Sequence, residues 1–173
     1  MPAPQDFPAA DFADVLTANK QFAATFGSPE LSGVARKGLA IITCMDSRID
    51  PLAIVGMNAG DVKILRNAGA RVTDDVLRTL VLATHLLGVN RVLVMPHTNC
   101  KMASATEAEI HDALAEASGY DTRSLDIAVV EDQLATLRSD LVRIRALPYL
   151  PTNLVVGGAI YDVTTGQLHP VDA

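Results

Sequence analysis

The stretch GLAIITC, residues 38–44, decides the fold because it is a short, continuous apolar run. Runs of this kind are typical of strands buried on both faces, as in parallel sheets covered by helices. Three more stretches have the same character: DVKILRNAG (61–69), NRVLVMP (90–96) and TNLVVGGAIY (152–161). A short edge strand is expected after a turn at Thr165–Gly166, ending before Pro170.

Helical patterns separate these strands. In TDDVLRTLVLATHLLG (73–88), Thr73 suits the N-cap and Gly88 suits the position after the last turn. Further helices are predicted at about 11–25, 106–117 and 125–146. Strands that alternate with helices predict an α/β fold with a mainly parallel sheet, here as one domain over residues 1–173.

Composition excludes several classes of protein. The 173 residues are 49% hydrophobic and 20% charged, with a formal net charge of -6. An acidic chain without clustered Lys and Arg lacks the footprint of a nucleic-acid-binding protein. No apolar run approaches the roughly 18–20 residues that span a bilayer, and the first residues lack the pattern of a secretion signal. We therefore expect a cytoplasmic protein with no membrane or nucleic-acid partner.

The two cysteines of the chain, Cys44 and Cys100, each follow a predicted strand, and His97 precedes Cys100 by three residues. Ligand sites of open α/β sheets lie at the carboxyl ends of the strands, so these residues plausibly converge. Two thiolates and one imidazole suit Zn²⁺, and three protein ligands leave the open position of a catalytic site. The alternatives are cysteines buried as small apolar residues, or a redox pair, which a reducing cytoplasm disfavours.

Asp46 and Arg48 follow Cys44 closely. A carboxylate and a guanidinium at this spacing can form a two-pronged pair, which would keep Asp46 ionised and oriented beside the metal. Asp46 would then accept a hydrogen bond from a metal-bound water, or move onto the metal as a fourth ligand. The alternative is an aspartate that caps a helix and an arginine on the surface.

Three blocks together carry a family resemblance: Cys44-x-Asp46-Ser47-Arg48, then RNAG (66–69), then His97-x-x-Cys100. In order and spacing they resemble the signature blocks of the β-class carbonic anhydrases, of the compact bacterial type. The resemblance implies a parallel four-stranded sheet with an added edge strand, flanked by helices. It also implies one zinc ion per chain, held by Cys44, His97 and Cys100.

The same resemblance implies roles for other residues. Asp46 and Arg48 would form a catalytic dyad, with Asp46 as the fourth zinc ligand in a closed state. Four residues would shape the pocket, namely Arg66, Asn67, Ala68 and Gly69. Lys101 stands where most family members have glycine, and the sequence leaves open whether it points to solvent or into the cleft.

The implied activity is that of a lyase, the reversible hydration of carbon dioxide to bicarbonate and a proton by zinc-bound hydroxide. The alternative on the same scaffold is hydrolysis of carbonyl sulfide or carbon disulfide. A catalytically weak zinc protein with a sensing or interaction role is a third hypothesis. From the residues alone, the apolar stripe from Phe12 to Phe26 could pack on the chain's own core or on a partner subunit. The resemblance further implies a homodimer or a dimer of dimers, in which residues 1–30, an N-terminal arm and a helix, pack on a partner subunit.

Overall fold

The computed structural model describes residues 6–27 and 30–172, which belong to two compact units, residues 1–31 and 32–173. Residues 1–5 of the expected N-terminal arm lie outside the described part. The described residues of the first unit contain one helix, α1 (Ala13–Thr25), which begins two residues later than the sequence pattern predicts. Among the described residues, no helix combines the length and the apolar character that crossing a bilayer requires.

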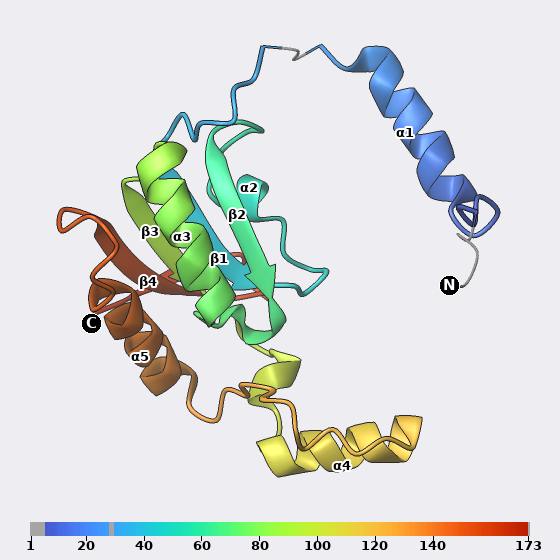
Figure 1. Cartoon of the computed structure of the whole chain (residues 1–173), viewed down its shortest axis with the longest axis vertical. Helices are drawn as coiled ribbons and strands as arrows, with labels where there is room; N and C mark the ends of the chain where they lie inside the picture. The colour runs from blue at the N-terminus through green and yellow to red at the C-terminus, as the bar shows by residue number, and fades with distance from the viewer. Residues whose placement is uncertain (1–5, 28–29, 173) are drawn as a thin grey trace. The chain divides into compact units, whose positions relative to one another are not determined.

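The second unit contains a sheet of five strands among the described residues, in the order β2-β1-β3-β4-β5 (Figure 1). The strands are β1 (Leu39–Cys44), β2 (Val62–Asn67), β3 (Arg91–Met95), β4 (Val155–Tyr161) and β5 (Leu168–Val171). The first four pair in parallel, and β5 pairs antiparallel with β4. The prediction of a parallel four-stranded sheet with an added edge strand is confirmed. Strand β5 includes Pro170, contrary to the expected boundary, because an edge strand tolerates a residue without an N–H.

Helices in this unit are α2 (Pro51–Ile54), α3 (Asp74–Leu86), α4 (Glu107–Ser118) and α5 (Gln133–Arg145). The Thr73 hydroxyl accepts from the N–H of Val76, as predicted for an N-cap. The predicted start of the last helix at residue 125 is wrong. Helix α5 begins eight residues later, because the Asp132 side chain accepts from the N–H groups of Leu134 and Ala135 and caps the helix there.

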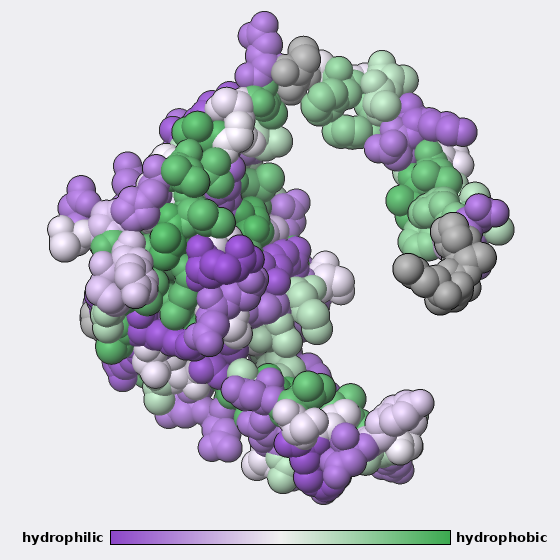
Figure 2. Space-filling view, in the orientation of Figure 1, coloured by the Kyte–Doolittle hydropathy of each residue, from purple (hydrophilic) through white to green (hydrophobic). Residues whose placement is uncertain are grey.

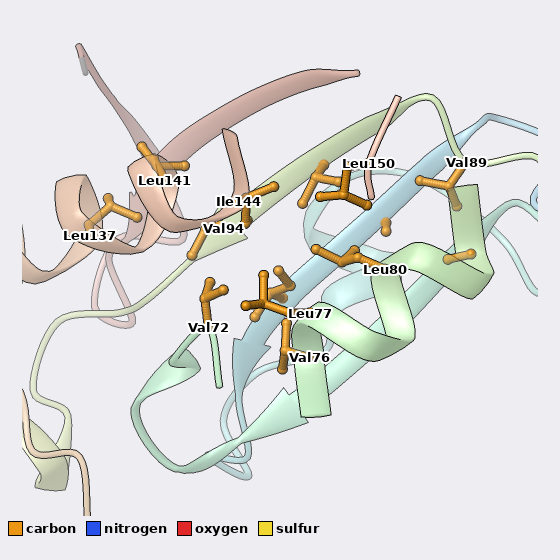
Figure 3. Packing of buried hydrophobic residues seen from close by; sticks show 14 of the residues in the cluster. Val72, Val76, Leu77, Leu80, Val89, Val94, Leu137, Leu141, Ile144 and Leu150 are labelled. Atoms are coloured by element: carbon orange, nitrogen blue, oxygen red, sulfur yellow. The ribbon is translucent and has the colours of Figure 1, made fainter. Parts of the chain in front are cut away.

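Strand β1 is buried along its whole length, which explains its continuous apolar sequence. Its side chains alternate between two clusters. Ala40 and Ile42 pack with α3 and α5 on one face of the sheet, where Leu80 and Leu141 meet the strands (Figure 3). Side chains of the opposite phase form the second cluster with both cysteines, namely Leu39, Ile41 and Met95.

The register of β1 and β3 brings the predicted site together. Thr43 pairs with Met95, and the Thr43 hydroxyl donates to the Met95 carbonyl at 2.8 Å. Both strands therefore end at one edge of the sheet, and their next residues leave it side by side. The first ligand segment (residues 44–48) begins at the last residue of β1, and the second ligand segment (residues 97–100) begins two residues after the end of β3.

Candidate metal centre

Cys44, His97 and Cys100 are all buried, and their ligand atoms lie within 4.8 Å of one another. The two Sγ atoms are 3.9 Å apart. Two thiolates bound to one zinc ion in a tetrahedron, each at about 2.3 Å from the metal, lie about 3.8 Å from each other. The donor set and its spacing therefore fit a single zinc ion without movement of the backbone.

The imidazole of His97 is oriented for metal binding. Its Nδ1 lies 2.8 Å from the Thr98 carbonyl oxygen, which can only accept, so Nδ1 carries the proton. Within residues 6–27 and 30–172, the Nε2 atom is the one buried side-chain nitrogen or oxygen without a hydrogen-bond partner. A buried polar atom without a partner is costly, and a metal ion would supply the missing interaction.

Burial sets the protonation of the metal-free ligands. It lowers the pKa of His97, which favours the neutral imidazole that binds metals. Burial raises the pKa of the Cys100 thiol, so a bound metal must displace a proton from that sulfur. Metal affinity is consequently expected to rise with pH.

Asp46 and Arg48 form the predicted two-pronged pair. Arg48 Nε donates to Oδ1 of Asp46 at 2.9 Å, and Nη2 donates to Oδ2 at 2.7 Å. The hydrogen bonds from the Arg48 side chain hold the pKa of Asp46 well below its usual range, so the carboxylate is ionised at neutral pH. Its Oδ2 lies 3.7 Å from Nε2 of His97. The carboxylate is therefore beside the ligand group but engaged with Arg48.

Arg66 holds the first ligand segment by its backbone. Its guanidinium donates to the carbonyl oxygens of Cys44 at 2.9 Å, Asp46 at 2.7 Å and Ile49 at 3.3 Å. A single side chain thus satisfies carbonyl groups that a chain leaving a sheet would otherwise present to solvent. Arg66 fixes the path of the segment that carries one ligand and the dyad.

The residues after Arg66 form a turn that lies close to Met102, just after the second ligand segment. The Asn67 side chain accepts from the Arg71 N–H at 2.8 Å and donates to the Arg71 carbonyl at 2.7 Å. Gly69 follows Ala68 in a short 3₁₀ turn with φ of 77°, and a Cβ at Gly69 would meet Met102 and Val130 at 3.3 Å. Glycine is therefore required here by conformation and by close approach.

The second ligand segment is anchored by hydrogen bonds to several distant parts of the chain, among them one from the Val163 N–H to the Thr98 hydroxyl at 3.1 Å. Gln133, the first residue of α5, donates from Nε2 to the His97 carbonyl at 2.6 Å. The Thr98 N–H donates to the Tyr161 carbonyl at 2.9 Å, and the Thr98 hydroxyl donates to Asp162 at 3.4 Å. Sequence reasoning missed Gln133, and no local signal could have found it because 36 residues separate it from His97.

Asn99 was also missed. It has a φ of 54°, in the left-handed region that asparagine tolerates better than most residues, and its carbonyl accepts from Arg48 Nη2 at 3.1 Å. This bond joins the two ligand segments through the dyad. An asparagine directly before a candidate ligand was the available signal.

An open depression of about 510 Å³ lies beside the ligand group. Lys101 is exposed and is among the residues that line this depression. Residues 66–69 are not among the lining residues. Their contribution is to position the backbone, as Arg66 does for the first ligand segment. The lining residues are Asp46, Arg48, Asn99, Cys100, Lys101, Ala103, Ser104 and Gln133.

The fold and the site define a class of protein, an α/β domain with two thiols and an imidazole that could hold a metal ion at the carboxyl ends of parallel strands. Residues 39–168 match the family model described as carbonic anhydrase. The chain is 32% identical over 158 residues to β-carbonic anhydrase 1 of Mycobacterium tuberculosis, covering 91% of this chain and 96% of that one. This protein belongs to the β-carbonic anhydrase family.

Two further comparisons bear on fold and substrate. A carbonic anhydrase structure from Streptococcus mutans superimposes with a TM-score of 0.88 at 34% identity, covering 97% of this chain and 100% of that chain. A carbon disulfide hydrolase of Acidithiobacillus thiooxidans is 30% identical over 153 residues, covering 76% of each chain. The family therefore includes relatives with both of the activities that the sequence suggests.

Proposed function

We propose that this protein catalyses the reversible hydration of carbon dioxide to bicarbonate with one zinc ion per chain. The observation that carries the proposal is the buried group of Cys44, His97 and Cys100, with the unpartnered Nε2 of His97 and the Asp46–Arg48 pair beside it. When bound, zinc acts as a Lewis acid that lowers the pKa of a water molecule towards neutrality and so supplies the nucleophile.

The chain's own residues orient that reaction. Asp46 is ionised, so it accepts hydrogen bonds and cannot donate one. It holds the hydrogen of the attacking water, which leaves an oxygen lone pair free to face the carbon of carbon dioxide. Arg48 keeps Asp46 in this orientation through two hydrogen bonds. In the closed alternative, Asp46 would give up its hydrogen bonds to Arg48 and would itself serve as a fourth protein ligand of the metal.

Hydrolysis of carbonyl sulfide or carbon disulfide is the second candidate, and the relatives that carry the latter name favour it. Both substrates are linear and apolar like carbon dioxide, so the same attack applies. The depression is lined by the charged side chains of Asp46, Arg48 and Lys101. Attack by hydroxide on any of the three substrates gives an anion, bicarbonate or a thiocarbonate, so this lining suits both reactions. The higher identity and coverage of the carbonic anhydrase relative favour carbon dioxide as the first candidate.

One preparation decides between the candidates. Zinc content is measured together with stopped-flow hydration of carbon dioxide between pH 6.5 and 9, and with sulfide release from carbonyl sulfide and carbon disulfide. Rapid carbon dioxide turnover with slow sulfide release supports the proposal. The reverse result favours the hydrolase. Zinc at one per chain without turnover of any of the three substrates favours the sensing or interaction protein.

We also propose that the chain forms a homodimer, or a dimer of dimers, through residues 1–30. Helix α1 buries none of its residues, and apolar groups gather along it (Figure 2). The aromatic side chains of Phe12, Phe22 and Phe26 are all exposed. Exposed aromatic groups of this extent favour a partner surface. Light scattering after size exclusion tests the assembly, and Phe22→Ser should shift it towards smaller species.

The proposed location is the cytoplasm. Cys44 and Cys100 are free thiols whose sulfur atoms lie 3.9 Å apart, and both are needed as metal ligands. A reducing compartment keeps them available for the metal. Fractionation of cells, with detection of the protein by antibody, tests this assignment.

A further inference from the structure

Lys101 lines the depression beside the candidate metal centre. Among the charged side chains of that lining, it is the one without a described ion-pair partner. Arg48 is paired with Asp46 at 2.7 Å. In contrast, the ammonium group of Lys101 forms no hydrogen bond or ion pair with any residue in the described ranges 6–27 and 30–172. The side chains that line the depression therefore carry one uncompensated positive charge.

This positive charge contrasts with the formal net charge of the whole chain, which is -6. An adjoining hollow, which shares Ala103 with the depression, is lined by Glu109 and Glu131. An anion that approaches this face meets acidic groups on one side and Lys101 on the other. Charge at the mouth of a cleft changes the local concentration of a charged substrate and its rate of encounter.

We propose that Lys101 attracts and retains the anionic member of the substrate pair, bicarbonate, at the mouth of the site and so sets the affinity for that anion. The inference rests on the proposed function for the identity of the anion, while the attraction of a small monovalent anion follows from the charge alone. Carbon dioxide is neutral, so its binding gains nothing from Lys101. The residue is thus a specificity-determining residue rather than a catalytic one.

The test compares Lys101→Gln, Lys101→Arg and Lys101→Glu with the wild type. The KM for bicarbonate in the dehydration direction should rise about threefold in Lys101→Gln and about tenfold in Lys101→Glu, and should stay near the wild-type value in Lys101→Arg. The inhibition constant of bicarbonate as product should change by the same factors. At a given pH, the equilibrium constant of the reaction fixes the ratio of kcat/KM for hydration to kcat/KM for dehydration, so no variant can change this ratio. The KM for bicarbonate is therefore the quantity to compare between variants.

Salt provides a readout that a merely structural role of Lys101 would not move. The difference between wild type and Lys101→Gln should shrink as ionic strength rises from about 0.01 M, where the screening length is about 30 Å, to about 1 M, where it is about 3 Å. Lys37→Gln is the matched control, because Lys37 precedes the start of β1, at the opposite end of the strand from Cys44. That variant should keep the wild-type KM for bicarbonate.

A binding measurement separates this inference from the proposed function. The dissociation constant of thiocyanate is measured from the visible spectrum of the cobalt-substituted protein, and should rise about threefold in Lys101→Gln. Weaker thiocyanate binding in a protein without carbon dioxide turnover would support the role of Lys101 and reject the proposed function. An active wild type with unchanged bicarbonate KM in Lys101→Gln, or Lys101→Arg behaving like Lys101→Gln, would overturn the inference.

Discussion

The two ligand segments leave neighbouring strands side by side, yet they are held in different ways. The first, residues 44–48, carries one ligand and the dyad, and the guanidinium of Arg66 binds it at three carbonyl groups. The second, residues 97–100, carries two candidate ligands and is held by several separate hydrogen bonds. Gln133 and Val163 donate to it, and Tyr161 and Asp162 accept from it. Apart from the bonds of Met45 to Asn67 and of Arg48 to Asn99, the first segment is held mainly by the side chain of one residue, whereas the support of the second is distributed.

The largest expected effect comes from removing a ligand of the second segment. Cys100→Ser replaces a buried thiolate with a hydroxyl, which is a poor zinc ligand, and leaves two protein ligands. Zinc content should fall well below one per chain, and carbon dioxide hydration should fall below detection. Metal analysis and stopped-flow assays measure the two quantities. Zinc at one per chain in this variant would contradict the ligand assignment.

Removing the charge of the dyad in the first segment should separate chemistry from metal binding. Asp46→Asn keeps the shape of the side chain, but it introduces an amide donor where only an acceptor serves. We expect zinc at one per chain and a fall in kcat/KM of roughly 100-fold or more. Activity within threefold of the wild type would break the assignment of Asp46.

The dependence of the first segment on one residue is tested by Arg66→Met. This variant keeps most of the aliphatic stem and removes the donors to the carbonyls of Cys44, Asp46 and Ile49. The free energy of unfolding should fall by about 2 kcal/mol, and kcat/KM should fall about tenfold. Denaturant titration and stopped-flow assays measure both changes.

Arg78→Met is the control for that change, because Arg78 is exposed and pairs with exposed Asp75 on α3. Its free energy of unfolding should change by less than about 0.5 kcal/mol. Equal losses in the two variants would show that Arg66 has no special role in holding the first segment.

The distributed support of the second segment predicts a smaller effect for any one anchor. Gln133→Leu removes the donor to the His97 carbonyl, while the Thr98 bonds to Tyr161 and Asp162 remain. The free energy of unfolding should fall by about 1 kcal/mol, and the rate of zinc dissociation should rise no more than about tenfold. Competition with a chromophoric chelator measures the dissociation rate. A loss as large as that of Arg66→Met would remove the contrast between the segments.

The smallest effect is expected from Asp162, and it depends on pH. Hydrogen bonds from the N–H groups of Thr164 and Thr165 lower the pKa of Asp162 below its usual value. A carboxyl whose pKa is lower in the folded state stabilises the fold above its unfolded pKa, about 3.9, and loses this contribution as pH falls further. The stability difference between wild type and Asp162→Asn should therefore shrink on acidification from pH 6 to pH 3, as followed by thermal unfolding. A difference that grows on acidification would contradict the assignment.

Much of the fold was predictable because the signals are local. The apolar run at 38–44 and the similar runs that follow define buried strands, and Thr73 marks the start of α3. The start of α5 was not predictable from the apolar pattern, because the cap at Asp132 competes with a helical pattern that begins earlier. The location of the candidate site also followed from the sequence. The candidate residues stand at the carboxyl ends of predicted strands, and parallel strands place these ends on the same side of the sheet.

The sequence by itself determined which strand carries which candidate residues. One candidate ligand and the Asp46–Arg48 pair come at the end of one strand, and two candidate ligands follow another. Only the tertiary structure decided how these residues act together. The bond from Arg48 to the Asn99 carbonyl, the three carbonyls bound by Arg66 and the anchor at Gln133 all depend on contacts between segments that are distant in the sequence. Residue patterns encode what a segment tends to form, whereas hydrogen bonds between distant segments exist only once the strands are in register.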